Sequence, residues 1–277
     1  MARQGGLRGT GVPLSGSANS ARAFQHLVVS ERPGVLSVTI DREAKRNALS
    51  LAVLQEIRRV FETRARDGSL KAATVTGSGE KSFAAGGDLR ELDAVRSVED
   101  TRNMSELGRS ALDAIRSFPV PVVAILNGTA LGGGAELAMA CDFRLATPRA
   151  SIGFLQGALN VTPAWGGGLD LIERIGSAPA LRLLATAQVL KAPEALALGV
   201  VDALSDASRP LSESVGSFLG PILAREPHVL RAMKELRLAA RRNVLGDLAE
   251  LETRHFVDSW THDAHWEAAD GVLGGRK

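Results

Sequence analysis

Hydrophobic and polar positions in the first half of the chain follow two alternating periods. Short β-branched runs predict strands, and apolar residues at helical spacing predict helices between them. The predicted strands are 27–29 and 35–40, which form a hairpin, then 72–76, 122–126 and the apolar segment 143–146. The predicted helices are 50–66, 102–118 and a short one that begins at Ala135. This alternation predicts an α/β core with a parallel sheet and helical crossovers.

The pattern changes in the second half of the chain. From Gly166 onward nearly every segment has helical spacing, apart from a short strand at 200–204. The helices predicted there are 178–187, 211–223, 229–240 and 245–260. We therefore expect three parts, which are a disordered tail at 1–23, an α/β core at 24–200 and a helical extension at 201–277.

The composition excludes several classes of protein. Of the 277 residues, 45% are hydrophobic and 23% are charged, which is typical of a globular protein. A net charge of +2 and an aromatic content of 4% give no general reason to bind nucleic acid. No apolar run is long enough for a membrane span, and the single cysteine, Cys141, favours a reducing, cytoplasmic location. His255, His262 and His265 lack a complement of further ligands, so we expect no metal site.

Two glycine-rich loops carry the candidate chemistry. One runs from Ser82 to Leu89 and the other from Leu131 to Leu137, and each follows a buried strand. Glycine leaves backbone N–H groups unobstructed, and the second loop begins a helix whose dipole favours negative charge. Two converging N–H donors form an oxyanion hole, which stabilises a thioester oxygen as it becomes an enolate. Taken alone, each loop fits a tight turn with close helix packing better than an oxyanion hole.

Four stretches of the chain carry a resemblance to a known family. They are Asp41-Arg42 with Asn47-Ala48-Leu49, FAAGGDL at 83–89, NGTALGGGAELAMACDFRLAT at 127–147, and Pro163 with Gly166-Gly167. Together they resemble the enoyl-CoA hydratase/isomerase, or crotonase, family, and the 127–147 stretch does so almost residue for residue. The resemblance runs from about residue 24 to 277. It implies an α/β fold, a crotonase-type spiral of ββα units with a helical C-terminal extension.

The resemblance implies roles for residues of both loops. The N–H groups of Gly87 and Gly133 would form the oxyanion hole, and Glu136 falls on the family's first catalytic glutamate. CoA would lie along the first loop, with Lys45 and Arg46 near its phosphates. The substrate- and CoA-binding residues implied in this way are Lys45, Arg46, Ala84, Ala85, Gly86, Asp88, Leu89 and Trp165.

The resemblance also implies the partners of the chain. It implies an acyl-CoA thioester as substrate, no cofactor apart from the CoA of that substrate, and a role in fatty acid metabolism. It implies a homotrimer, or a hexamer built from two trimers. The helices of the extension, with Phe256, Trp260 and Trp266, fit either an intersubunit surface or part of the core. We expect neither nucleic acid nor a membrane as a partner.

One position departs from the family pattern. Hydratases and many isomerases of the family have a second catalytic glutamate, and the matching position here is Gln156. A glutamine cannot give or take a proton at neutral pH, and no Asp or Glu occurs between Ala150 and Trp165. Because a malonyl-type thioester loses CO₂ to give an enolate without any base, Gln156 favours a decarboxylating acyl-CoA lyase. The turn at 161–167 also resembles that of the ethylmalonyl-CoA decarboxylase branch.

Other functions stay open on the sequence alone. Glu136 by itself could support hydration of a 2-enoyl-CoA or an isomerisation. The same oxyanion hole would serve a thioester hydrolase or a C–C bond enzyme of a biosynthetic pathway. An alternative of a different class is a non-catalytic module that binds acyl-CoA or RNA, although the low net charge and the few aromatic residues disfavour RNA.

Overall fold

Two β-sheets form the centre of the molecule, which is a computed structural model that describes residues 24–245 and 248–274. The predicted tail at 1–23 lies outside the described residues. The larger sheet contains, in spatial order, β1 (Leu27–Arg32), β2 (Val35–Ile40), β3 (Ala72–Gly77), β5 (Val122–Leu126), β7 (Phe143–Ala146) and β10 (Ala203–Leu204). The smaller sheet contains β4 (Ser82–Ala84), β6 (Thr129–Leu131), β8 (Ser151–Gly153) and β9 (Val189–Lys191).

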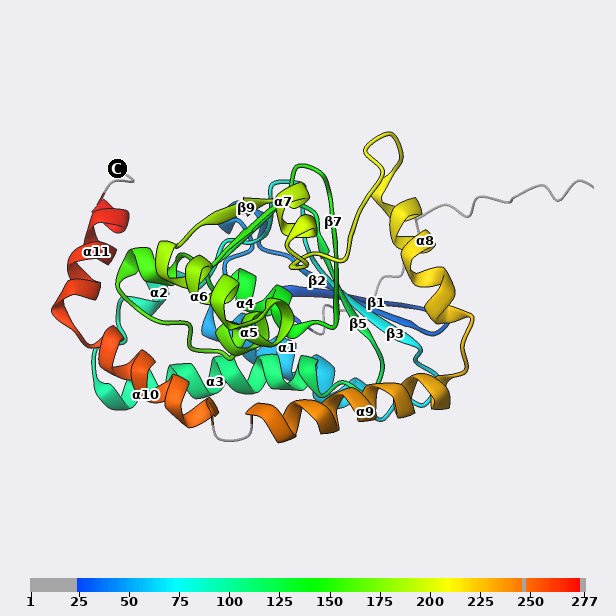
Figure 1. Cartoon of the computed structure of the whole chain (residues 1–277), viewed down its shortest axis with the longest axis horizontal. Helices are drawn as coiled ribbons and strands as arrows, with labels where there is room; N and C mark the ends of the chain where they lie inside the picture. The colour runs from blue at the N-terminus through cyan, green and yellow to red at the C-terminus, as the bar shows by residue number, and fades with distance from the viewer. Residues whose placement is uncertain (1–23, 246–247, 275–277) are drawn as a thin grey trace, which may run out of the picture.

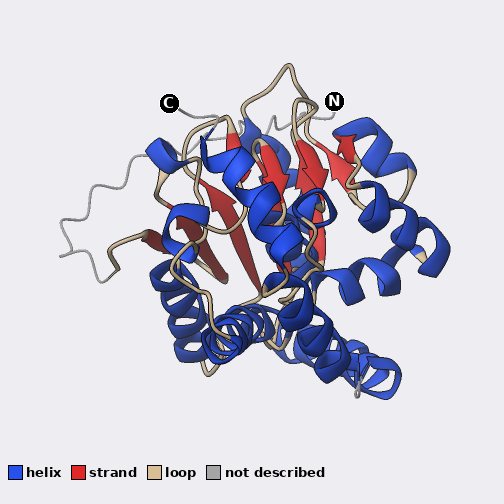
Figure 2. Cartoon of the chain, turned by 90° about the vertical axis from the view of Figure 1, so that its left-hand side faces the viewer, coloured by secondary structure: helices blue, strands red, loops and turns tan. Residues whose placement is uncertain are grey.

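Consecutive strands alternate between the two sheets. The strand β3 is followed by β4, β5 by β6 and β7 by β8, and helical segments follow each of these pairs. Pairing within the sheets is parallel, except that β1 pairs antiparallel with β2 and β8 with β9. Figure 2 shows the strands grouped together with helices packed around them. This arrangement confirms the expected spiral of ββα units.

Helices account for most of the remaining described chain. In the first half they are α1 (Leu51–Arg64), α2 (Leu89–Leu92), α3 (Val98–Arg116) and α4 (Gly133–Ala140), with short 3₁₀ helices η1 (Glu43–Lys45) and η2 (Leu155–Leu159). In the second half they are α5 (Gly167–Ile175), α6 (Ser177–Thr186), α7 (Ala192–Ala197), α8 (Leu211–Leu223), α9 (Pro227–Leu245), α10 (Leu248–Trp260) and α11 (Asp263–Gly274). Figure 1 shows α9 and α10 along the lower side of the molecule, where α10 packs against α3.

The hydrophobic core is divided by the larger sheet. The residues of β5 alternate between its two faces, so Val122 and Ala124 join one apolar cluster while Val123 and Ile125 join the other. The main cluster lies on the side of α1, α3, α4 and α10. The smaller cluster lies under α8, whose Leu219 is buried against the opposite face of the sheet. The functional cavity described below belongs to the main cluster.

The structure corrects several details of the predicted elements. Strand β4 lies inside the segment assigned to the first glycine-rich loop, β6 ends at the first residue of the second loop, and none of β6, β8 and β9 was predicted. These strands have three residues each, which is too short to establish a period of two. Phe256 and Trp260 of α10 are buried in the core of their own chain, which decides between the two roles left open for them. In the part of the chain that the structure describes, no helix is both long and apolar enough to cross a membrane.

Candidate active site

The two glycine-rich loops lie side by side because the strands before them are neighbours. The strands β4 and β6 pair in parallel, so the loops that follow them leave the same edge of the smaller sheet. Gly86 has a φ of +104° and Gly132 a φ of +53°, in the left-handed region that favours glycine. A Cβ atom on Gly86 would lie 3.1 Å from the carbonyl oxygen of Leu131, which shows how closely the loops approach.

The N–H groups of Gly87 and Gly133 have no acceptor within the described part of the chain. In the first loop, the backbone of Leu49 bonds to Gly86 and Asp88 on either side and leaves the N–H of Gly87 free. In the second loop, Gly133 is the first residue of α4, and the first N–H groups of a helix lack intrahelical acceptors. Both glycines line one cavity. Their N–H groups are therefore available to a ligand oxygen, as an oxyanion hole requires.

The first loop is fixed in place by the segment that contains η1. Asn47 is buried, and its side-chain amide donates a hydrogen bond to the carbonyl oxygen of Ser82 at 2.8 Å. Asp88 accepts a hydrogen bond from Nη2 of Arg42 at 2.9 Å and lies 3.6 Å from Nζ of Lys45. Burial opposes the effect, but these two cations hold the pKa of the Asp88 carboxyl below its ordinary value. Asp88 is thus a carboxylate that anchors the loop.

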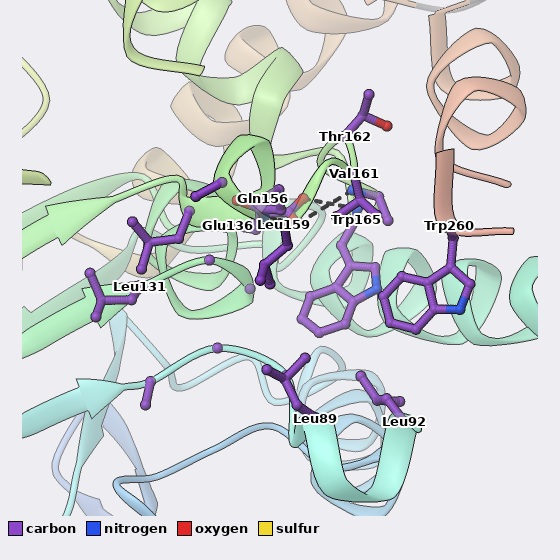
Figure 3. Close-up of a pocket in the computed structure, with 18 of the residues that line it drawn as sticks. Leu89, Leu92, Leu131, Glu136, Gln156, Leu159, Val161, Thr162, Trp165 and Trp260 are labelled. Atoms are coloured by element: carbon purple, nitrogen blue, oxygen red, sulfur yellow. Dashed lines mark hydrogen bonds between the residues drawn. The ribbon is translucent and has the colours of Figure 1, made fainter. Parts of the chain in front are cut away.

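Glu136 points into the cavity from the first turn of α4 and is only 2% exposed. Its Oε2 atom accepts hydrogen bonds from the N–H groups of Trp165 at 2.8 Å and Gly167 at 3.0 Å. Its Oε1 atom accepts one from Nε2 of Gln156 at 2.9 Å and a longer one from the N–H of Ala164 at 3.4 Å. The side chain is therefore held from several directions, as Figure 3 shows.

The surroundings of Glu136 raise the pKa of its carboxyl group. Burial and the negative charge of Glu252 raise the pKa of Glu136 to about 7, although the N–H donors of Trp165, Gly167 and Ala164 oppose the rise. Proton transfer is most efficient when the pKa of the group lies near the working pH. Glu136 can therefore serve as either proton donor or proton acceptor.

Gln156 lies in η2 beside Glu136 and also lines the cavity. Its Nε2 atom donates to Glu136, whereas its Oε1 atom is buried and receives no hydrogen bond from any described residue. An amide carries both donor and acceptor atoms, so it can bond to Glu136 whether that carboxyl is ionised or protonated. The structure thus places a non-ionisable partner next to the one carboxyl group that lines the cavity in the described chain.

The cavity has a volume of 320 Å³ and mainly apolar walls. Besides the backbone of the glycine loops, the polar lining residues are Arg46, Glu136, Gln156 and Thr162, and most other lining side chains are apolar (Figure 3). The apolar lining includes Leu89, Leu92, Met104, Leu131, Leu159, Phe256 and Trp260. Such a cavity, with few polar groups that converge on one point, is typical of a small-molecule site. It suits a short apolar group next to a polar reacting centre.

The indole of Trp165 fills the space between α3 and the oxyanion glycines. A Cβ atom on Gly108 of α3 would lie 2.1 Å from its Nε1, and one on Gly133 would lie 2.3 Å from its Cζ3. Only glycine at these two positions leaves room for the ring. Trp165 is 4% exposed, and Figure 3 shows it next to Trp260 at one end of the cavity. The two rings limit the cavity on this side.

Most of the site residues expected from the sequence line this cavity. They are Arg46, Ala85, Gly86, Gly87, Leu89, Gly133, Glu136, Gln156 and Trp165. Three expected residues lie elsewhere. Ala84 is buried within β4, Asp88 is bound to Arg42, and the side chain of Lys45 is 64% exposed at the surface. The structure does not bring these three side chains into the cavity.

The sequence motifs do not include the residues that α3 and α10 contribute to the site. Glu252 accepts a hydrogen bond from the N–H of Gly166 at 2.8 Å, and Phe256 and Trp260 line the cavity. One signal could have indicated them. Glu252, Phe256 and Trp260 recur at every fourth position of a predicted helix, so a charged residue shares one face with two aromatic residues. A charge on a buried face needs a partner.

The C-terminal histidines are placed away from Glu136. The Nδ1 atom of His265 lies 2.7 Å from the carbonyl oxygen of Leu159, and its ring packs against Trp260 with centroids 4.5 Å apart. His255 and His262 line a separate, open hollow of the surface. Over residues 24–245 and 248–274, no group of three or more His, Cys, Asp or Glu side chains could hold a metal ion.

Comparison with known proteins identifies similar chains. Residues 30–273 match the family described as enoyl-CoA hydratase/isomerase. Over 209 residues the chain is 35% identical to a short-chain-enoyl-CoA hydratase of Clostridium acetobutylicum, covering 75% of this chain and 79% of that protein. Over 242 residues it is 32% identical to an ethylmalonyl-CoA decarboxylase of Pongo abelii, covering 86% and 79%.

Solved structures resemble the whole described fold. An enoyl-CoA hydratase of Bacillus anthracis matches with a TM-score of 0.75 and 30% identity, covering 91% of this chain and 97% of that one. An enoyl-CoA hydratase of Bacillus halodurans matches with a TM-score of 0.82 at 22% identity, covering 89% and 100%, which supports the fold alone.

Proposed function

The chain belongs to the enoyl-CoA hydratase/isomerase family, and we propose that it is an acyl-CoA lyase that removes CO₂ from a malonyl-type acyl-CoA. The observation that carries this proposal is the pair formed by Glu136 and Gln156. A single carboxyl with a raised pKa faces the two free N–H groups, and its polar neighbour cannot ionise. This set of groups suits a reaction that creates an enolate without a second base.

The proposed reaction uses the glycine loops first. The thioester oxygen accepts hydrogen bonds from the N–H groups of Gly87 and Gly133. The bond between the α-carbon and the substrate carboxylate breaks, its electron pair enters the thioester as an enolate, and CO₂ leaves. The N–H groups stabilise the negative charge that develops on the oxygen. The apolar walls weaken the hydration of the substrate carboxylate, which favours its loss.

Glu136 then completes the reaction. In its protonated form it donates its proton to the α-carbon, and it regains a proton from solvent, so that each turnover consumes one proton. A pKa of about 7 makes the protonated form accessible at neutral pH. A neutral Glu136 also avoids placing two negative charges side by side while the substrate carboxylate is bound. Gln156 keeps Glu136 oriented without competing for the proton.

A second candidate function is hydration of a 2-enoyl-CoA. The buried Oε1 atom of Gln156 is an unused acceptor on the cavity wall, which suits a water molecule beside Glu136. In this reaction the water oxygen bonds to the β-carbon, Glu136 takes a proton from the water, and the C=C electron pair forms the enolate. Glu136 then gives that proton to the α-carbon. The hydratase named among the similar proteins supports this alternative.

Substrate binding and assembly extend the proposal. We assign the phosphates of CoA to the neighbourhood of Lys45 and Arg46, because Arg46 lines the cavity and Lys45 is exposed next to it. Neither reaction needs a cofactor other than the CoA of the substrate. By family membership we assign the chain to a homotrimer or to a hexamer of two trimers, and by its single cysteine to the cytoplasm.

Product analysis by mass spectrometry tests the proposal. The purified protein is incubated separately with ethylmalonyl-CoA, methylmalonyl-CoA and crotonyl-CoA, and the variant Glu136→Gln serves as the control for contaminating activity. We expect loss of CO₂ from a malonyl-type thioester and no hydration of crotonyl-CoA. Hydration of crotonyl-CoA with both malonyl-type thioesters unchanged would replace the proposal by the second candidate. Binding of all three without turnover would indicate a non-catalytic module.

A further inference from the structure

The turn between η2 and α5 is bound by two carboxylates from different parts of the chain. Four consecutive residues, Ala164 to Gly167, direct their N–H groups at these carboxylates. Glu136 of α4 accepts the first, second and fourth of them, and Glu252 of α10 accepts the third, from Gly166 at 2.8 Å. The turn therefore joins the cavity carboxyl to a helix of the C-terminal extension.

Glu252 is held in this position by α3. Its Oε2 atom accepts a hydrogen bond from Nη2 of Arg109 at 2.5 Å. The same Nη2 atom donates to the carbonyl oxygen of Ala164 at 3.2 Å, so Arg109 contacts both Glu252 and the turn. The side chains of Arg109 and Glu252 are 15% and 10% exposed. This ion pair is shielded from solvent and has a defined geometry.

We propose that Glu252 is a positioning residue: it fixes the turn that holds Glu136, so that α10 controls the surroundings of the active-site carboxyl. The inference rests on the proposed function only in taking Glu136 as the group that exchanges the proton. Glu252 is absent from the residues that line the cavity, so it acts through Glu136 and the turn.

The other charges around Glu136 are already paired with one another. From α3, Arg116 donates to the carbonyl oxygen of Trp165 at 2.7 Å and is paired with Asp170 of α5 at 2.8 Å. Arg241 of α9 pairs with the same aspartate at 2.6 Å, and Arg109 pairs with Glu252. No cation among the described residues contacts Glu136 directly. Burial and, after it, the like charge of Glu252 raise the pKa of Glu136. Burial also raises the pKa of Glu252, although its ion pair with Arg109 opposes the rise.

The helix α10 supplies a matched control residue. Glu250 lies two positions before Glu252 and also pairs with an arginine of α3, because Arg102 approaches it at 3.4 Å. Its side chain is 75% exposed, however, and among the described residues it bonds to Arg102 and not to the turn. The variant Glu250→Gln thus removes a carboxylate and an ion pair between the same two helices without touching the surroundings of Glu136.

The test is a titration of Glu136 that needs no turnover. The carboxyl carbons of glutamate are labelled with ¹³C, the Glu136 signal is assigned by its loss in Glu136→Gln, and its chemical shift is followed against pH by NMR. The variant Glu252→Gln keeps an oxygen that can accept from Gly166 and Arg109 but removes the charge. We expect its Glu136 signal to titrate about one pH unit below that of the wild type. Glu250→Gln should titrate like the wild type.

Two results would overturn the proposal. The first is a Glu136 titration that is the same in Glu252→Gln and in the wild type. If circular dichroism shows that Glu252→Gln does not fold, the wild-type curve decides instead, because two interacting carboxyls titrate in two linked steps. The second result that would overturn the proposal is a wild-type Glu136 signal that titrates in a single step at the ordinary pKa of a glutamate. An altered titration without any turnover would leave the inference standing and remove the proposed function.

Discussion

The two sides of the cavity use the same backbone group in opposite ways. On the side of the glycine loops, the N–H groups of Gly87 and Gly133 have no acceptor in the described chain. On the side of the turn, four consecutive N–H groups are all bound to the carboxylates of Glu136 and Glu252. The donors of the first side are free for a negative charge that forms during the reaction, and the donors of the second side are already bound to two carboxyl groups of the protein.

The difference follows from what stands next to each set of donors. The glycine loops have no side chain that reaches their N–H groups, so these donors stay free for a ligand. The turn lies between α3, α4 and α10, where buried donors without acceptors would cost free energy. Two acidic residues supply those acceptors. A donor set that is free at the point of reaction and saturated elsewhere is what electrostatic preorganisation requires.

The largest expected effect comes from removing the charge that the turn holds. Glu136→Gln leaves a side chain of similar size that cannot exchange a proton, so we expect kcat to fall by roughly 10²–10⁴-fold. The measurement is the initial rate of acyl-CoA conversion, with circular dichroism to confirm folding. The exposed Glu213 of α8, changed to Gln, is the control and should keep full activity. Unchanged activity in Glu136→Gln would show that the carboxyl held by the turn takes no part in the reaction.

A slightly smaller effect is expected on the side of the free donors. In Gly133→Ala the added Cβ atom would lie 2.3 Å from Cζ3 of Trp165, so either the ring or the loop has to move. Alanine keeps the N–H at this position, but this movement displaces the donor, and we expect kcat to fall by up to roughly 10²–10³-fold, the typical effect of losing one oxyanion donor. Gly216 of α8 has no atom within 4 Å of such a Cβ, and Gly216→Ala should be as active as the wild type. The measurement is kcat of both variants with the same acyl-CoA substrate. Equal values for Gly133→Ala and Gly216→Ala would contradict the prediction.

A third variant disturbs the saturated side without removing any donor. A Cβ atom on Gly167 would lie 2.5 Å from the side chain of Glu136, whereas one on the adjacent Gly168 would lie no closer than 3.3 Å to its neighbours. We expect Gly167→Ala to lower the free energy of unfolding by about 1–3 kcal/mol and to reduce activity, with a smaller effect for Gly168→Ala. Urea unfolding of both variants measures the difference. Equal losses would show that the contact with Glu136 is not the cause.

The smallest expected effect is a dependence on pH. Burial and the charge of Glu252 raise the pKa of Glu136 to about 7, so the protonated form disappears as the pH rises through this value. For decarboxylation, kcat/KM should fall across that range, whereas a rise would favour the hydration candidate. The folded protein binds this proton more tightly than the unfolded chain, so the stability that it contributes at low pH is lost as the pH rises toward 7. Unfolding of Glu136→Gln should lack this component.

The glycine-loop side could be predicted from the sequence, because its signal is local. The stretch from Asn127 to Thr147 contains the strand, the glycines and Glu136 in one continuous motif. Regular elements with a clear period were also predicted with the observed bounds, as for Val122–Leu126 and Leu211–Leu223. The short strands β4 and β6 were missed because their pairing depends on neighbours far along the chain.

The turn side could be predicted only in part. Pro163 and the glycines after it are visible in the sequence, but the acceptor for Gly166 lies 86 residues further on, in a helix that the pattern leaves either at a surface or in the core. Periodicity shows that Glu252 shares a face with Phe256 and Trp260, and it does not show what that face contacts. Only the packing of α10 against α3 decides this.

We propose that the free donors and Glu136 together form and protonate a thioester enolate. Hydrogen exchange at the α-carbon of butyryl-CoA in D₂O isolates this step, because this saturated thioester can lose neither CO₂ nor water. We expect the wild-type protein to incorporate deuterium at the α-carbon, detected by mass spectrometry, and Glu136→Gln and Gly133→Ala to do so far more slowly. Binding of butyryl-CoA by the wild type without any exchange would show that these groups do not form an enolate.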